Sequence, residues 1–160
     1  MSELDALLNR VAKNSRHRRR WAAREGLEAY RLYDRDMPEF PLAIDRYGDW
    51  LHLQVFERRR PLPDDLLEAL RLSLAEAQQV PAPQVVLKQR RRQRGADQYE
   101  KTRLSTPSFR IRERGLRFEV NLGRYLDTGL FLDHRDTRSL VAGLVNGRSF
   151  LNLFAYTGSF

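Results

Sequence analysis

The spacing of apolar residues predicts a helix at the start of the chain. Ser2 and Asp5 stand at the spacing of a capping box, in which each side chain bonds the backbone amide of the other. Because apolar side chains then recur at helical spacing, the segment has one apolar face. These side chains are Leu4, Leu7, Leu8 and Val11. We expect the helix to continue into an arginine-rich stretch and to end at Gly26.

The pattern then changes to period two, which predicts strands. A short strand is expected over 30–33. The segments 42–47 and 50–56 flank the turn dipeptide Gly48-Asp49, so we expect them to form a β-hairpin. His52 falls on the polar face of the second segment. We interpret it as a solvent-facing strand residue rather than a ligand.

A second helix and a further strand are predicted after the first hairpin. Asp64 or Asp65 can cap this helix, which carries an apolar stripe and is expected to end at Val80, before Pro81. A strand over 84–88 follows and leads into a basic run.

The last third of the chain alternates again and then turns helical. Segments 109–112 and 116–122 predict a hairpin with one apolar face and one arginine-rich face. Asp133 is placed to cap a helix that ends at Asn146-Gly147. The apolar stripe of that helix comprises Leu140, Val141, Leu144 and Val145. The apolar run 150–154 predicts a buried parallel strand, which needs cover on both faces.

The order of these elements predicts two architectures in tandem. The first is an α+β module, a mainly antiparallel sheet with helices, over 1–124. The second, over 125–160, is the beginning of a doubly wound α/β sheet, with the boundary near 122–128. Gly158 follows the last predicted strand, where open α/β sheets place their ligands. No further parallel strand follows, so we expect the front piece of a longer enzyme whose catalytic residues lie outside it.

Composition narrows the class of protein. The chain has 160 residues, 41% of them hydrophobic, and no cysteine, which excludes disulfides, thiolate metal sites and a cysteine nucleophile within it. We expect no metal site. No apolar stretch approaches the roughly 18 residues of a membrane span, and the N-terminus has no signal-peptide core. A cytoplasmic protein without a membrane partner is therefore expected.

Basic residues are clustered rather than dispersed. The net charge of +8 arises largely from residues 10–24, which contain no acid, and from residues 88–103. Such clusters can be a solubilising surface, but two arginine-rich clusters favour nucleic acid, because arginine contacts phosphates and bases bidentately. The RNA contacts expected in them are Arg18, Arg19, Arg20, Lys88, Arg90, Arg91, Arg92, Arg94 and Lys101. Tyr99 is interpreted equally well as a base-stacking residue and as an ordinary edge-packing tyrosine.

Three segments taken together resemble one known family. They are YRLYDRDMPEF over 30–40 with AIDRY over 43–47, YLDTGLFLDHR over 125–135, and FLNLFAYTGS over 150–159. In this order they closely resemble the bacterial 23S rRNA guanine methyltransferase that is fused from two enzymes. The match begins near Glu25 and is to the start of the C-terminal half, which forms 7-methylguanine. The half that forms N2-methylguanine has no counterpart here and is a possible fused or upstream partner.

The resemblance implies a Rossmann-like methyltransferase domain that binds S-adenosylmethionine and acts on 23S rRNA. In the family, the segment that ends in Tyr-Thr-Gly is the first cofactor motif. Residues carried over to the methionine end of the cofactor are Asn152, Phe154, Tyr156, Thr157, Gly158 and Ser159. Asp133, His134 and Arg135 would meet the cofactor from the other side, and Arg135 would pair with its carboxylate. Without the resemblance, Asp133 is only a cap, Arg135 a surface residue and Phe154 a core residue.

The chain also departs from the family. The acid that would hold the cofactor ribose and the Asp-Pro-Pro motif that would contact the base are absent. We therefore expect no measurable methyl transfer and weak cofactor binding by these residues alone. One alternative is a related RNA cytosine-C5 methyltransferase with a similar Tyr-Thr-Gly start, whose chemistry needs a cysteine. The other is a non-catalytic RNA-binding module.

Overall fold

A four-stranded mixed sheet organises the first half of the protein. The computed structural model describes residues 2–56, 61–90, 106–125 and 127–160. The strands are β1 (Ala29–Asp34), β2 (Leu42–Tyr47), β3 (Trp50–Phe56) and β4 (Val85–Arg90), in that spatial order. The first three pair antiparallel, as their alternation predicts. β4 pairs parallel to β3, after a crossover through α2 (Asp64–Ala77) and the 3₁₀ turn η1 (Ala82–Gln84).

The N-terminal helix α1 spans Glu3–Glu25 and confirms the predicted start and stop signals. Ser2 Oγ accepts from the Asp5 amide at 3.1 Å, and Asp5 Oδ2 accepts from the Ser2 amide at 2.8 Å. The chain leaves the helix at Gly26 with φ of 64°, a left-handed conformation that glycine adopts without steric cost.

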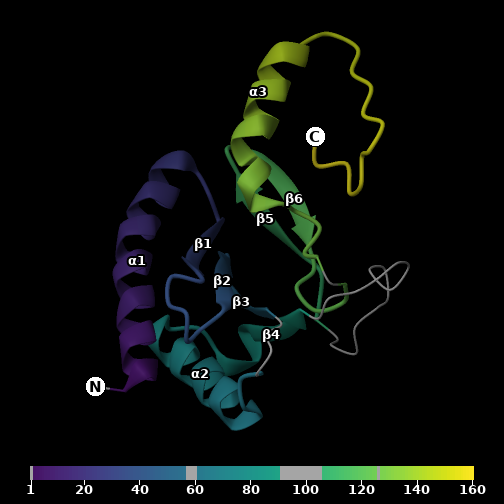
Figure 1. The fold of residues 1–160 in the computed structure, drawn as a ribbon. Helices are drawn as coiled ribbons and strands as arrows, with labels where there is room; N and C mark the ends of the chain where they lie inside the picture. The colour runs from purple at the N-terminus through teal and green to yellow at the C-terminus, as the bar shows by residue number, and fades with distance from the viewer. Residues whose placement is uncertain (1, 57–60, 91–105, 126) are drawn as a thin grey trace.

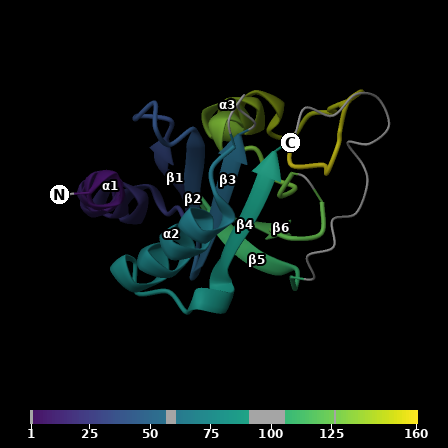
Figure 2. The ribbon, with the colours of Figure 1, turned by 60° about the horizontal axis from the view of Figure 1, so that its bottom comes forward.

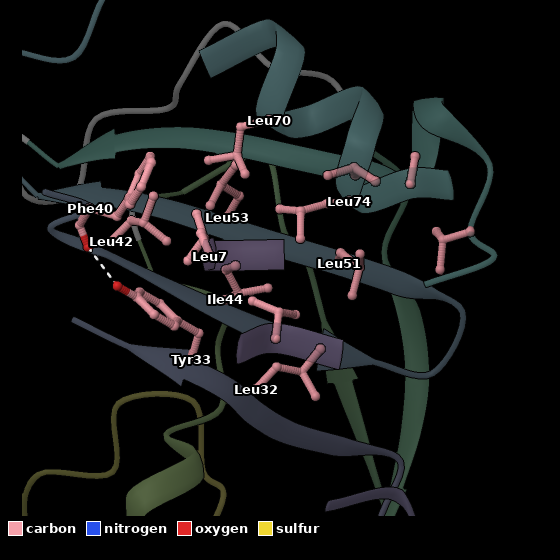
Figure 3. Packing of buried hydrophobic residues seen from close by; sticks show 14 of the residues in the cluster. Leu7, Leu32, Tyr33, Phe40, Leu42, Ile44, Leu51, Leu53, Leu70 and Leu74 are labelled. Carbon is pink, nitrogen blue, oxygen red and sulfur yellow. Dashed lines mark hydrogen bonds between the residues drawn. The ribbon is translucent and has the colours of Figure 1, made fainter. Parts of the chain in front are cut away.

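Both long helices cover one face of the sheet (Figures 1 and 2). Leu7 of α1 and Leu70 of α2 are fully buried against the apolar side chains of the central strands (Figure 3). On this face, Tyr33 donates its hydroxyl to the carbonyl of Phe40 at 3.1 Å. Each fully buried side chain of this size stabilises the fold by about 1.5–3 kcal/mol, so this cluster is the main core.

The opposite face is also covered, by a second hairpin and the segment that follows it (Figure 2). β5 (Phe109–Glu113) and β6 (Leu116–Val120) form this hairpin. It is anchored beside the end of α1, where Glu28 N donates to Arg112 O at 2.9 Å and Arg114 N to Gly26 O at 3.0 Å. The cluster between the layers comprises Ala29, Tyr47, Val86, Ile111, Val120, Leu122 and Leu130.

This second layer overturns the expectation for His52, which is fully buried rather than solvent-facing. The prediction was wrong because alternation tells which residues share a face but not whether another layer covers that face.

Two predicted helix caps are also wrong. α2 begins at Asp64 after Pro63 without a side-chain cap, and it ends at Ala77 instead of Val80. Asp133 lies within the 3₁₀ turn η3 (Leu132–His134), so it precedes the first position of α3 (Arg135–Val145) by two residues and does not cap it.

The predicted buried strand over 150–154 does not form. These residues are irregular, and the side chain of Phe154 is 94% exposed. A parallel strand needs hydrogen-bonded neighbours and cover on both faces, and neither described sheet pairs with this segment. The apolar stripe of α3 is uncovered as well, with Leu140 63% and Leu144 61% exposed. The α+β part of the predicted fold is therefore formed, whereas the α/β part contributes only η3, α3 and a loop.

Among the described residues, no helix combines the length and the apolar character that crossing a membrane requires.

Candidate functional site

The segment from Asp127 to Arg135 contacts the C-terminal loop. Thr157 donates its hydroxyl to the carbonyl of Gly129 at 2.6 Å. The rings of Tyr156 and Phe131 have their centroids 5.4 Å apart, and those of Phe160 and His134 lie 6.1 Å apart. The fold therefore packs Tyr156 against Phe131, Thr157 against Gly129 and Phe160 against His134.

Other candidate cofactor residues of the loop point elsewhere. Asn152 accepts from the amide of Phe154 at 3.2 Å, within its own turn, and the Phe154 ring faces solvent. Gly158 has φ of 69° in a turn closed by its amide and the carbonyl of Ala155. A Cβ built on Gly158 would meet no atom within 4 Å, so the surface beside this glycine is open. Ser159, next to it, is half-buried.

Arg135 is buried and already paired within the protein. Its Nε donates to Glu113 Oε2 at 3.1 Å, and its NH2 donates to the carbonyl of Ala29 at 2.6 Å. Arg138, one helical turn later, binds both oxygens of the same carboxylate. These contacts fix the start of α3 to the hairpin and to β1. Asp133 and His134 are exposed beside them.

A cavity of about 400 Å³ lies on the other side of the 127–135 segment. Its floor is a cross-strand row in which Asp45 of β2 is paired with Arg31 of β1 and with His52 of β3. Asp45 Oδ1 accepts from Arg31 Nε at 2.8 Å, and Asp45 Oδ2 accepts from Gln54 Nε2 at 3.2 Å. The remaining wall comes from α1 and from the segment itself, with Arg18, Trp21, Asp127, Thr128, Leu130, Phe131, Leu132, Asp133 and Arg135.

The electrostatics of the cavity are set by Asp45 and Arg31. The hydrogen bond from Arg31 to Asp45 raises the pKa of the guanidinium above its usual value, against the effect of burial. Burial, and then the negative charge of Asp45, raise the pKa of Tyr47, whose hydroxyl lies 3.0 Å from that of Thr128. The floor therefore presents an ion pair between the buried Asp45 and the half-exposed Arg31, beside the hydroxyl of Tyr47.

Trp21 connects the cavity to the basic surface of α1. The guanidinium of Arg18 lies 5.9 Å from the centroid of its ring, and that of Arg135 lies 5.5 Å away. Arg18, Arg19 and Arg20 are all exposed on the second half of α1. These three arginines form what we call the α1 basic surface.

The second predicted basic cluster is only partly described. Lys88 is 4% exposed and donates its ammonium to the carbonyl of Tyr125, so it does not belong to an exposed basic surface. This corrects the expectation for Lys88, whose position in β4 places its side chain on the face that the second hairpin covers. The side chain of Arg90 lies outside the described part of the structure, as do Arg91, Arg92, Arg94, Tyr99 and Lys101.

Sequence reasoning missed the residues of the cavity floor and the carboxylate that anchors α3. Asp45, His52 and Gln54 alternate with apolar residues, and this pattern is typical of a solvated strand face. One sequence signal could have indicated a polar site: the hairpin over 42–56 places these three polar side chains on the same face. Glu113 directly follows the predicted strand 109–112 and has no such signal, yet it is a buried acid between two arginines.

Comparison with protein families gives one match over most of the chain. Residues 31–160 match the family described as S-adenosylmethionine-dependent methyltransferase.

Curated relatives and solved structures agree with that match. The ribosomal RNA large subunit methyltransferase K of Neisseria meningitidis serogroup B is 48% identical over all of this chain, which covers 46% of that protein. The methyltransferase K/L of Colwellia psychrerythraea is 44% identical over 98% of the chain, which covers 22% of that protein. The chain thus spans less than half of either relative. A proposed SAM-dependent methyltransferase from Streptococcus mutans has the same fold, with a TM-score of 0.72 at 24% identity, over 99% of this chain and 41% of that one.

Proposed function

We propose that this chain, which belongs to the S-adenosylmethionine-dependent methyltransferase family, is part of an enzyme that methylates guanine N7 in 23S rRNA. The observation that carries this proposal is the similarity along the whole chain to a ribosomal RNA large subunit methyltransferase K. The resemblance of three ordered segments to the 7-methylguanine-forming half of the fused enzyme supports the position on the base. In this proposal, residues 1–124 hold the RNA and residues 125–160 begin the methyltransferase domain.

The cofactor would bind where the C-terminal loop meets the start of α3. Asp133 offers an exposed carboxylate, and the turn around Gly158 offers open backbone, which suits a ligand with an amino group and a carboxylate. When bound, S-adenosylmethionine supplies an electrophilic methyl group that guanine N7 can accept without a general base, because N7 already has an in-plane lone pair. The residues of this chain would therefore act by positioning.

Arg135 would contribute to that positioning from inside the protein. Its contacts with Glu113 and with the carbonyl of Ala29 hold the adjacent Asp133 and His134 at the protein surface. The pairing of Arg135 with the carboxylate of the cofactor, which the resemblance implies, would require the guanidinium to share or exchange these partners.

RNA would be held by exposed arginines on two elements. The α1 basic surface is one of them, and the solvent-facing side of the second hairpin, with Arg110, Arg112 and Arg117, is the other. Contacts with phosphates release condensed counterions, so this contribution to affinity must weaken as salt rises. A base that is methylated at N7 within folded rRNA must also be made accessible, which usually requires extrusion from its stack.

The decisive experiment uses a longer polypeptide that contains these residues. It is incubated with unmodified 23S rRNA and S-adenosylmethionine, and the RNA is digested to nucleosides for mass spectrometry. We expect one 7-methylguanosine per rRNA. Formation of 5-methylcytidine would favour the cytosine-C5 alternative, and RNA binding without any methylation would favour the non-catalytic module. The 160-residue chain alone is expected to transfer no measurable methyl group, and turnover by it would contradict the assignment of an incomplete site.

A further inference from the structure

We propose that the second hairpin and the turn between β2 and β3 form a binding site for one nucleotide of single-stranded RNA, with its phosphate on Arg112 and Arg117 and its base beside Trp50. This inference rests on the proposed function, which places RNA on this hairpin, and it names the form of the RNA and the side chains that hold it. The described residues that line the site include none of the 127–135 segment and none of the C-terminal loop. The site would therefore hold RNA that flanks the target base.

The first observation is a pair of arginines that face each other across the hairpin. Arg112 of β5 and Arg117 of β6 are cross-strand partners, and both are exposed. Side chains in such positions have their Cβ atoms about 4.5–5.5 Å apart, so like charges there destabilise the sheet. The nearest acid to the Arg112 guanidinium is Glu28, at 3.9 Å, and Arg117 makes no ion pair or hydrogen bond with any described residue. A phosphate bound between the two guanidinium groups would relieve their repulsion.

A third arginine of the hairpin has the same orientation and is also available. Because alternate residues of a strand share a face, Arg110 lies on the same side of β5 as Arg112. It is exposed and makes no ion pair with Glu119, its cross-strand partner. The three arginines line a cavity of about 340 Å³ together with Glu28 and Ile111. Glu28 accepts from the backbone amide of Arg112 at 2.7 Å, so its carboxylate is directed at the backbone of β5. This cavity suits an anion.

The second observation is an aromatic pair in the adjoining cavity. The ring of Trp50, at the start of β3, stacks on that of Phe109, at the start of β5, with centroids 5.4 Å apart and planes inclined by 16°. Both side chains are half-buried and line a cavity of about 520 Å³, so part of each ring is accessible. Bases stack on aromatic side chains with little regard to sequence, because every base has a π-face. A base can do so only where it is not already stacked in a duplex, which favours single-stranded RNA.

The two cavities are continuous, because Glu28, Arg110 and Ile111 line both of them. The acid Asp49 lines only the larger cavity, so the phosphate is better placed in the smaller one and the base in the larger. Arg46 also lines the larger cavity. Its Nε donates to the carbonyl of Gly48 at 2.8 Å, whereas its two terminal nitrogens make no hydrogen bond with any described residue. These donors are left for the base or the ribose.

The hairpin also connects this site to α3. Alternation places Arg112 and Glu113 on opposite faces of β5. Glu113 binds Arg135 and Arg138 of α3 from inside the protein. A nucleotide held at Arg112 would therefore have a fixed position relative to the start of α3, where the cofactor is proposed to bind.

The test uses the fluorescence of Trp50, since a base that stacks on an indole quenches its emission. The chain has two tryptophans, so Trp21→Phe leaves Trp50 as the single reporter. This variant of the 160-residue chain is titrated with a short oligouridylate and with an abasic oligomer that has the same number of phosphates. The oligouridylate is expected to quench Trp50. The abasic oligomer should bind at least about fivefold more weakly and should not quench, because it lacks the stacking contribution.

Two double variants, each made in the Trp21→Phe chain, complete the test. Arg110→Gln with Arg117→Gln should weaken the binding that quenches Trp50 and make its log–log salt dependence shallower by about one. Arg35→Gln with Arg148→Gln removes the same charge from exposed positions outside both cavities and should change neither. If Trp21→Phe fails to fold, the indole N–H signal of Trp50 in the 15N-labelled protein replaces its emission.

Three results would overturn the proposal. The first is RNA binding that leaves the Trp50 signal unchanged, and the second is equal quenching by the abasic oligomer. The third is an equal effect of the two double variants, which would show that binding follows net charge.

These outcomes are separable from the fate of the proposed function. If the longer polypeptide forms 7-methylguanosine while Trp50 does not respond to RNA, only the nucleotide site is wrong. If Trp50 responds as expected but no 7-methylguanosine forms, the nucleotide site stands and the proposed reaction fails.

Discussion

Arg138 and Glu113 form a two-point ion pair in the interior of the protein. Arg138 Nε donates to Glu113 Oε1 at 2.8 Å, and its NH2 donates to Oε2 at 3.0 Å. The remaining NH1 donates to the carbonyl of Phe131 at 2.9 Å. This arginine therefore joins the second hairpin, the rim of the cavity and α3. The same carboxylate also binds Arg135, so one acid holds both buried arginines of α3.

Replacement of Glu113 should lower the free energy of unfolding. Glu113→Gln leaves two buried guanidinium groups with a neutral partner, and breaking a buried ion pair in this way typically destabilises a protein by about 3–5 kcal/mol. Urea unfolding followed by circular dichroism measures the change. Glu119→Gln, an exposed acid on the same hairpin, is expected to change the free energy of unfolding by less than about 0.5 kcal/mol. Equal effects of the two changes would show that the buried carboxylate anchors nothing.

Substitutions in the exposed apolar stripe of α3 should change the free energy of unfolding little, in contrast to Glu113→Gln. Leu140→Ser together with Leu144→Ser should leave the free energy of unfolding of the 160-residue chain within about 1 kcal/mol, because both side chains already contact water. Leu70→Ala in the core should cost about 2–5 kcal/mol. Denaturant titration of the three proteins gives the comparison. A loss for the α3 double variant as large as that for Leu70→Ala would mean that α3 packs more fully than described.

Because Tyr47 is buried, we expect the folded protein to lose stability at alkaline pH. Its pKa is raised in the folded protein by burial and by Asp45, so the unfolded chain loses the proton first, near pH 10. The contribution of protonated Tyr47 to the free energy of unfolding is fully present below pH 10. Above that pH, the free energy of unfolding falls by up to about 1.4 kcal/mol per pH unit. Tyr47→Phe should make this fall shallower, as measured by urea unfolding between pH 9 and 11. Tyr125→Phe, an exposed control, should not, and an unchanged slope in Tyr47→Phe would contradict the assignment.

The α1 basic surface should set part of the salt dependence of RNA binding. Arg19→Gln with Arg20→Gln removes two exposed charges, so the slope of log affinity against log salt should become shallower by about one to two. Fluorescence anisotropy with a labelled single-stranded RNA measures this slope. Arg35→Gln with Arg148→Gln removes the same charge from other exposed positions. If the control flattens the slope as much as the α1 change, binding follows net charge rather than this surface.

Local patterns were sufficient to predict most elements of the α+β part. The capping box at Ser2, the stop at Gly26 and both hairpins depend on neighbouring residues, and all of them form. The failures depend on partners distant in sequence. His52 is buried because a hairpin that begins more than fifty residues later covers its face, and residues 150–154 are exposed because no described strand pairs with them.

The residues of the candidate site likewise fall into those that the sequence indicated and those that only the fold shows. The resemblance implies cofactor roles for Tyr156 and Thr157, and the fold places these two residues against Phe131 and Gly129. It gave no role to Asp45, although this residue stands in the segment 43–47 that carries part of the resemblance. The pairing of Asp45 with Arg31 across the strands, and the cavity beside them, are visible only in the folded structure.

The central claim is that this chain belongs to an enzyme that forms 7-methylguanine in 23S rRNA. Its most direct test is nucleoside mass spectrometry of 23S rRNA from the organism that encodes the chain, with and without the corresponding gene. The deletion is expected to remove one 7-methylguanosine per rRNA and to leave 5-methylcytidine unchanged, and a plasmid copy should restore the lost modification. An unchanged 7-methylguanosine content after deletion would contradict the claim.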